Sequence, residues 1–203
     1  MRAFEYRQAE EVRDSLRRHG VRYLFIGKSG AILLGFPDTT QDADLFVERS
    51  QENGRALVAA LREIGFGLAD EQAAEIERGK DFVQLRCGPF DLDLVFAPDG
   101  IETFQEAQGR SLCAEGIPVC HLDDIIRSKE DANRIKDRET LPRLLDEEKA
   151  ELIAQGLGRG IHAGVVPVIL NPLEKDRGGP TAVHFLPIRF LARSLCLVCV
   201  GIN

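Results

Sequence analysis

The chain has 203 residues, of which 44% are apolar and 29% charged, a balance typical of a globular protein with one domain and additional sequence. The formal charge of −7 is uneven, because residues 1–150 hold 21 Lys and Arg against 30 Asp and Glu, whereas residues 151–203 hold 5 against 3. An acidic domain lacks the basic surface that nonspecific binding of long nucleic acids requires. That function class is excluded, while a small or structured RNA stays open as a substrate.

The N-terminal residues and the cysteines point to a cytoplasmic protein. The first ten residues, MRAFEYRQAE, lack the apolar core of a secretory signal, and no window approaches the roughly 20 apolar residues that span a bilayer. The five cysteines form an odd set without a disulfide framework, and we expect buried thiols at Cys87, Cys113, Cys120, Cys196 and Cys199. The lone CxxC formed by the last two is a weak indication of a metal or redox site.

The first predicted elements are a helix and a strand. Apolar residues recur at spacings of three or four from Tyr6 to Leu16, and the pattern stops at Gly20, as in an amphipathic helix closed by a glycine. Residues 21–26 are almost continuously apolar, which is typical of a strand at the centre of a sheet.

A glycine turn, Gly27-Lys28-Ser29-Gly30, follows this strand and precedes a short apolar helix. Glycine allows close approach of the backbone to a ligand, and Lys28, Ser29 and free N–H groups at a helix start suit a phosphate. The same tetrapeptide also serves as an ordinary turn between a strand and a helix. Both interpretations are open on these residues alone.

The next strand carries two aspartates on one face. In Asp42-Ala43-Asp44-Leu45-Phe46-Val47 the period of two places Asp42 and Asp44 on the same side as Phe46. Aspartate is disfavoured in strands, and neighbouring carboxylates repel each other unless a proton or a cation lies between them. A divalent metal ion would resolve this conflict.

A second pair of aspartates repeats the pattern. A helix is expected over residues 51–65, and a solvated helix or loop over 70–80. Strands over 82–87 and 90–96 then form an antiparallel hairpin around Gly88-Pro89. Asp91 and Asp93 share a face of the second strand. If this strand lies beside the one with Asp42 and Asp44, the carboxylates form an oxygen-rich site of the kind that Mg²⁺ or Mn²⁺ prefers.

The remaining elements end in a helix with an unusual lysine. A short helix is expected over residues 101–108, and residues 117–120 are expected as an edge strand because they include Pro118. His121 precedes the next helix as a cap or packing residue. Lys129 falls on the apolar side of that helix, where it must reach solvent or meet an anion such as an aspartate cluster or a triphosphate.

The composition changes from Gly156 onward. Residues 156–203 hold seven glycines and four prolines and show no helical periodicity. We therefore expect a domain over residues 1–150 and an irregular tail of unknown role over residues 151–203.

These motifs resemble the nucleotidyltransferase superfamily related to DNA polymerase β. The superfamily has a hydrophobic residue, Gly, then Gly or Ser, a spacer, and Asp-x-Asp between apolar residues. Here Ile26, Gly27 and Lys28 are followed by thirteen residues and then by Asp42 and Asp44. Thr40 fits the T-x-D-x-D form of the small bacterial members.

The resemblance extends to residues 117–141, which are similar to the helix after the core of minimal bacterial nucleotidyltransferases. Its K-x-x-x-x-R-x-K-D ending is matched by Lys129, Arg134, Lys136 and Asp137. The likeness covers residues 20–145. It implies an α/β (α+β) fold with a mixed, largely antiparallel central sheet and flanking helices.

The resemblance also implies a two-metal transfer of an NMP from an NTP to a hydroxyl acceptor. Asp42, Asp44 and Asp93 would be the catalytic carboxylates that hold Mg²⁺ or Mn²⁺. The nucleotide would be bound by Gly27, Lys28, Ser29 and Lys129. The acceptor would be an RNA end such as that of tRNA, a protein or a small molecule.

The sequence departs from the superfamily's pattern at three positions. Lys28 stands at the second Gly or Ser position, Asp38 where relatives often carry arginine, and Asp91 is an additional acid. The alternative to an enzyme is a noncatalytic nucleotide-binding partner or regulatory subunit, for example in a toxin and antitoxin pair.

Overall fold

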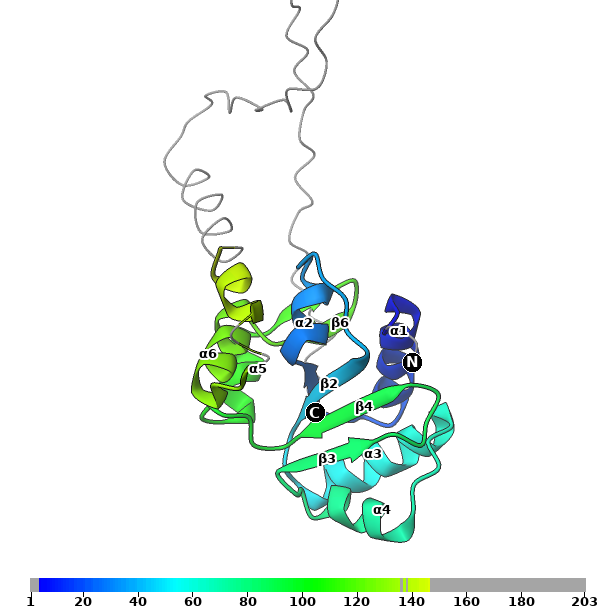
Figure 1. Ribbon diagram of the computed structural model, residues 1–203. Coiled ribbons are helices and arrows are strands. Elements are labelled where there is room, and N and C mark those ends of the chain that lie inside the picture. Colours follow the sequence, from blue (N-terminus) through cyan, green and yellow to red (C-terminus); the bar gives the residue numbers. More distant parts are fainter. Residues whose placement is uncertain (1–3, 136, 138, 147–203) are drawn as a thin grey trace, which may run out of the picture.

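A computed structural model describes residues 4–135, 137 and 139–146 of the chain. These residues form a sheet of six strands with helices packed on both faces (Figure 1). The predicted tail over residues 151–203, with Cys196 and Cys199, lies outside the described residues. None of the described helices has the length and apolar character required to cross a membrane.

The elements follow one another in the order helix, strand, helix, strand, two helices, two strands, helix, two strands and helix. Their bounds are α1 (Tyr6–Arg18), β1 (Tyr23–Phe25), α2 (Gly27–Leu33), β2 (Asp42–Val47), α3 (Gln51–Ile64), α4 (Asp70–Glu77), β3 (Phe82–Leu85), β4 (Asp91–Val95), α5 (Phe104–Arg110), β5 (Leu112–Ala114), β6 (Ile117–Val119) and α6 (Leu122–Ala132). Residues 139–146 are helical as well.

The sheet is mixed, with the strand order β3-β4-β2-β1-β6-β5. The pairs β1/β2, β3/β4 and β5/β6 are antiparallel, whereas β2/β4 and β1/β6 are parallel. This confirms the mixed, largely antiparallel α/β fold, the central place of β1 and the hairpin of β3 and β4.

The expectation that the strand with Pro118 lies at an edge is wrong. β6 lies between β1 and β5, and the edge strand β5 gave no clear signal in the sequence. The proline is tolerated because β6 and β1 are in register only at Phe25 and Val119, so the parallel ladder is short beside Pro118.

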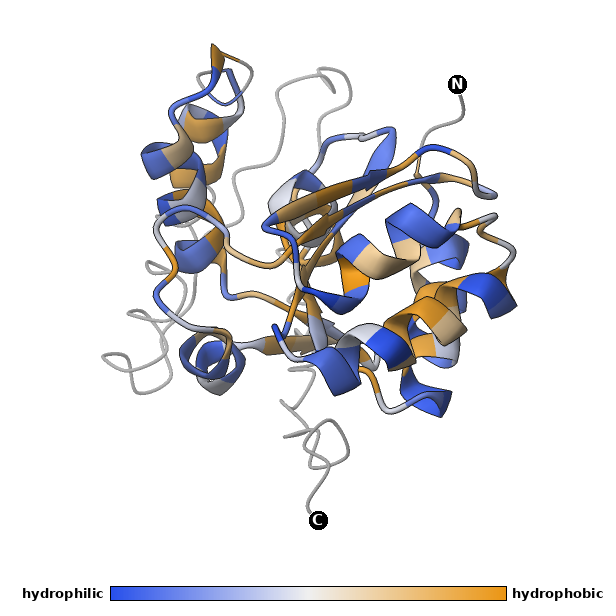
Figure 2. Cartoon of the chain, turned by 90° about the horizontal axis from the view of Figure 1, so that it is seen from below, coloured by the Kyte–Doolittle hydropathy of each residue, from blue (hydrophilic) through white to orange (hydrophobic). Residues whose placement is uncertain are grey.

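Two apolar cores lie on opposite faces of the sheet. Leu16 of α1, Leu57 of α3 and Ile76 of α4 belong to one core, and Ala31 of α2, Phe104 of α5 and Ile125 of α6 belong to the other. Figure 2 shows apolar residues along the central strands and hydrophilic residues over the outer faces of the helices. The sheet is therefore the middle layer of three.

Helix ends agree with the local sequence. The Ser50 side chain accepts a hydrogen bond from the Asn53 N–H at the start of α3, and Gly65 ends that helix with a left-handed backbone. At the start of α6, the His121 ring accepts from the Asp123 N–H, which confirms the predicted cap.

The expectation of buried thiols is correct for one of the three described cysteines. Cys120 is buried, and burial raises the pKa of its thiol, whereas Cys87 and Cys113 are exposed. Cys87 follows the end of β3, and Cys113 lies on the edge strand β5, so neither thiol is enclosed by a second layer.

Candidate functional site

The two strands that carry paired aspartates are neighbours. β2 and β4 run parallel, with Asp42 opposite Asp91 and Asp44 opposite Asp93. Side chains at opposed positions of adjacent strands are on the same face, and the strands are about 4.8 Å apart. The four carboxylates therefore lie on one small area of the sheet.

This area is left open by the helices. Further along β2 on the same face, the Phe46 ring packs on Phe104 of α5, with ring centroids 5.2 Å apart. Asp44 and Asp42 lie progressively farther from this contact and are partly exposed. The intervening residues of the strand face the opposite core and are fully buried.

A pocket of about 640 Å³ covers the open area, within the roughly 300–1,000 Å³ usual for ligand sites. Its walls come from α2, β2, β3, β4, α6 and the residues after α6. Six of the seven residues predicted to form the site line it, namely Gly27, Lys28, Asp42, Asp44, Asp93 and Lys129. The fold thus brings together residues that are far apart in the sequence.

Gly27 has a specific structural requirement. Its φ of 64° is in the left-handed region, and a Cβ atom there would lie 2.5 Å from the Asp44 Oδ2. The missing side chain therefore leaves the space that the Asp44 carboxylate needs. This agrees with the turn interpretation of Gly27, and its contact with a phosphate stays a prediction.

Ser29 lies beneath the pocket rather than at its wall. The buried Ser29 hydroxyl accepts a hydrogen bond from the Asp44 N–H at 2.9 Å and donates one to the Ile26 carbonyl at 3.1 Å. Both hydrogen bonds of this fully buried hydroxyl are made within the protein, so the Ser29 side chain links α2 to β2. It positions Asp44, and Ser29 is not among the residues that line the pocket.

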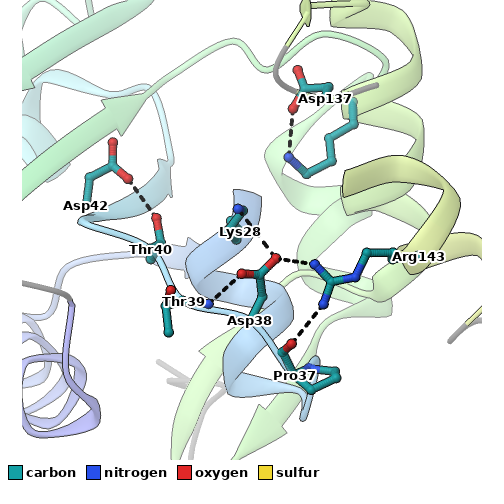
Figure 3. Close-up of polar contacts among 9 residues, drawn as sticks. Lys28, Pro37, Asp38, Thr39, Thr40, Asp42, Asp137 and Arg143 are labelled. Atoms are coloured by element: carbon teal, nitrogen blue, oxygen red, sulfur yellow. Dashed lines mark hydrogen bonds and ion pairs between the residues drawn. The ribbon is translucent and has the colours of Figure 1, made fainter. Parts of the chain in front are cut away.

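Two of the departures from the family pattern face each other. The Lys28 ammonium lies 3.5 Å from the Asp38 carboxylate, to which Arg143 also donates at 2.8 Å (Figure 3). The Thr39 N–H and then the charges of Lys28 and Arg143 lower the pKa of Asp38. Lys28, Asp38 and Arg143 thus form a small group of charges at the edge of the site.

Lys129 meets the anion that its position requires. Its ammonium donates to the Asp137 carboxylate at 2.8 Å, and the two side chains are only 12% and 7% exposed. Both residues belong to the predicted family motif, and Arg134 of that motif is exposed and also lines the pocket. Lys136 lies outside the described residues.

Sequence reasoning missed Arg86. Its guanidinium lies 3.0 Å from Asp93, 3.7 Å from Asp91 and 3.9 Å from Asp42. The sequence did contain a signal for it. Gln84 of β3 pairs with Asp93, and the side-chain alternation of a strand, continued past the end of β3, places residue 86 on the same face as Gln84. Gln84 itself donates to that carboxylate at 3.4 Å.

The donor chemistry of this area fits a hard divalent cation, since carboxylate oxygens are the ligands that Mg²⁺ and Mn²⁺ prefer. Yet within residues 4–135, 137 and 139–146 no three His, Cys, Asp or Glu side chains converge in an arrangement able to hold a metal ion. Asp42 and Asp93 instead both lie within 4 Å of the guanidinium of Arg86.

No protein-family model matches the chain, and no curated protein matches it significantly in sequence. A crystal structure from Thermotoga maritima, of a protein named as a “putative nucleotidyltransferase”, is similar to it with a TM-score of 0.45 and 19% sequence identity. The match covers 70% of this chain and 92% of that one. Similarity at this level does not carry an activity from one protein to another, so function has to be argued from the site.

Proposed function

We propose that this protein is a metal-dependent nucleotidyltransferase, which moves an NMP from an NTP to a hydroxyl group of an acceptor. The observation that carries the proposal is the register of β2 and β4, which aligns Asp44 with Asp93 at the wall of one pocket. Two carboxylates at this spacing repel each other unless a cation lies close to them, so the pair suits a site for cations.

The charges around the pocket support a nucleotide substrate. Lys28 and Arg134, both at its wall, supply positive charge for a triphosphate, and Gly27 leaves the space that the Asp44 carboxylate occupies beside it. The neighbour from Thermotoga maritima bears a name of the same class. That name agrees with the proposal but adds no weight to it.

The mechanism assigns a separate task to each group. Mg²⁺ or Mn²⁺, when bound by Asp42, Asp44 and Asp93, supplies neutralisation of phosphate charge and activation of a hydroxyl. Asp93 orients the acceptor hydroxyl for in-line attack on the α-phosphorus. The Asp93 carboxylate accepts the hydroxyl proton as the acceptor oxygen bonds to the α-phosphorus. The bond from the α-phosphorus to the oxygen of the β-phosphate breaks, and Lys28 stabilises the departing pyrophosphate.

The test is transfer of label from each α-labelled NTP, with Mg²⁺ or Mn²⁺, to the protein itself, a tRNA pool or a cell extract. We expect Asp44→Asn to reduce labelling at least about 100-fold, as loss of an essential charged group does. Asp91→Asn is the matched control on the same face, and it should keep labelling within about fivefold of the wild type, since Asp91 is not a member of the triad.

Equal labelling by the wild type and Asp44→Asn would contradict the proposal. Metal-dependent NTP binding without any labelling would favour the second candidate, a noncatalytic nucleotide-binding partner or regulatory subunit. One observation supports that candidate, namely that Arg86 already neutralises the carboxylates.

A further inference from the structure

Arg86 is a cation placed among the carboxylates proposed to bind metal. Its guanidinium lies within 4 Å of three aspartates on two strands, and Asp93, the nearest, is buried. Arginine keeps its charge at any pH a protein tolerates, and its planar fork can contact several carboxylates at once. The side chain therefore reduces the repulsion among the aspartates.

The position of Arg86 allows it to leave. The residue follows the last residue of β3, in the segment that leads to the turn before β4, and its side chain is 42% exposed. Two of its three contacts, at 3.7 and 3.9 Å, are longer than a hydrogen bond. A long, half-exposed side chain held in this way can turn toward solvent without disturbing the sheet.

A second cation cannot enter while the guanidinium stays. Asp42 and Asp93 would be ligands of a divalent ion, and both are among the carboxylates that Arg86 contacts. Two like charges at this spacing repel each other strongly where solvent is partly excluded. Binding of the metal and contact with Arg86 are therefore mutually exclusive.

We propose that Arg86 is an internal counter-cation, which competes with a divalent metal ion for Asp42 and Asp93 and so sets the affinity of the site for metal. This inference rests on the proposed function only in taking these carboxylates as metal ligands. The fold is stable without metal because Arg86 balances the aspartates. Metal binds with the guanidinium displaced to solvent.

The experiment measures Mn²⁺ binding to the full chain by calorimetry near neutral pH, without nucleotide. Arg86→Gln should bind Mn²⁺ about fivefold to tenfold more tightly than the wild type, because a competing charge has gone. Arg86→Lys keeps the charge and should stay within about twofold to threefold of the wild type. Arg49→Gln is the matched control, since it removes an exposed arginine that pairs only with Asp81 among the described ion pairs, and it should leave affinity unchanged.

A thermal melt separates competition from a purely structural role. Without metal, Arg86→Gln should lower Tm by about 2–4 °C, since the aspartates lose their counter-charge, and Mn²⁺ should raise its Tm more than that of the wild type. Arg86→Met, which keeps the apolar stem, serves as a second neutral variant. Adding Asp93→Asn to Arg86→Gln should remove the gain in affinity and so locate it at this site.

Equal or weaker Mn²⁺ binding by both neutral variants, with the wild type binding measurably, would overturn the role of Arg86 and leave the proposed function standing. Binding by the neutral variants alone would support competition in its strongest form. Absence of Mn²⁺ binding from the wild type and from both variants would overturn the metal-dependent function together with this inference.

Discussion

The two sides of the pocket balance their charges differently. On the strand side, one half-exposed arginine faces three aspartates at distances between 3.0 and 3.9 Å. On the helix side, Lys129 pairs with Asp137 at 2.8 Å, and Lys28 lies 3.5 Å from Asp38, which Arg143 also contacts. A shared, exposed counter-charge can be exchanged for a ligand, whereas a short buried pair is part of the fold.

The largest effect is expected at the buried pair. Lys129→Ala leaves the Asp137 carboxylate, which is only 7% exposed, without its cation, and should lower the free energy of unfolding by about 3–5 kcal/mol. Chemical denaturation measures this loss. Lys80→Ala breaks the exposed pair with Glu75 and is the control, with an expected loss below about 1 kcal/mol.

The double variant Lys129→Met with Asp137→Leu sharpens the comparison. It removes both charges and should recover most of the loss, because no buried charge is left over. A small loss of stability for Lys129→Ala together with weakened NTP binding would instead place Lys129 among the groups that exchange partners for a ligand.

A smaller effect on stability, with a large effect on the site, is expected at Gly27. Gly27→Ala should lower the free energy of unfolding by about 1–3 kcal/mol because φ is 64°, and its Cβ should displace the Asp44 carboxylate and abolish transfer and Mn²⁺ binding. Gly20→Ala has a matching φ of 66° with no atom within 4 Å of the added Cβ. It should lose similar stability and keep activity, and loss of activity by both variants would show that backbone strain, not the contact with Asp44, is responsible.

The smallest effect is expected at Asp38. Its pKa is lowered from the ordinary 3.8, first by the Thr39 N–H and also by Lys28 and Arg143, so the folded state binds its proton less readily than the unfolded state. The resulting stabilisation is present above about pH 4 and is lost as pH falls further.

Asp38→Asn should therefore lower stability by about 0.5–1 kcal/mol at pH 7, with the difference from the wild type shrinking below pH 4. Urea denaturation across this range measures it. A difference that stays constant down to pH 3 would show that the contacts of Asp38 contribute no stability that depends on charge.

Local sequence predicted most elements and six of the residues that line the pocket. The period of two identified the faces of Asp42, Asp44 and Asp93, and glycine identified the turn at Gly27, because side-chain alternation and backbone freedom are properties of a few adjacent residues. Whether the strand with Pro118 lies at an edge could not be read locally, since an edge is defined by whether another strand covers it.

The register of β2 with β4 was open in the sequence for the same physical reason. A strand can pair in either direction and in several registers, and the choice depends on packing of both faces against helices from elsewhere in the chain. This choice places Asp44 beside Asp93, which Arg86 contacts at 3.0 Å. The pairing of Lys28 with Asp38 and of Lys129 with Asp137 likewise depends on tertiary packing.

The sequence by itself thus determined which side chains are proposed for the chemistry, namely three aspartates, a glycine turn and two lysines, because residue type and spacing are written in the chain. Only the tertiary structure decided how their charges are balanced, because an ion pair depends on distances of a few ångströms between segments far apart in sequence. That balance divides the pocket into an exchangeable strand side around Arg86 and a fixed buried pair at Lys129.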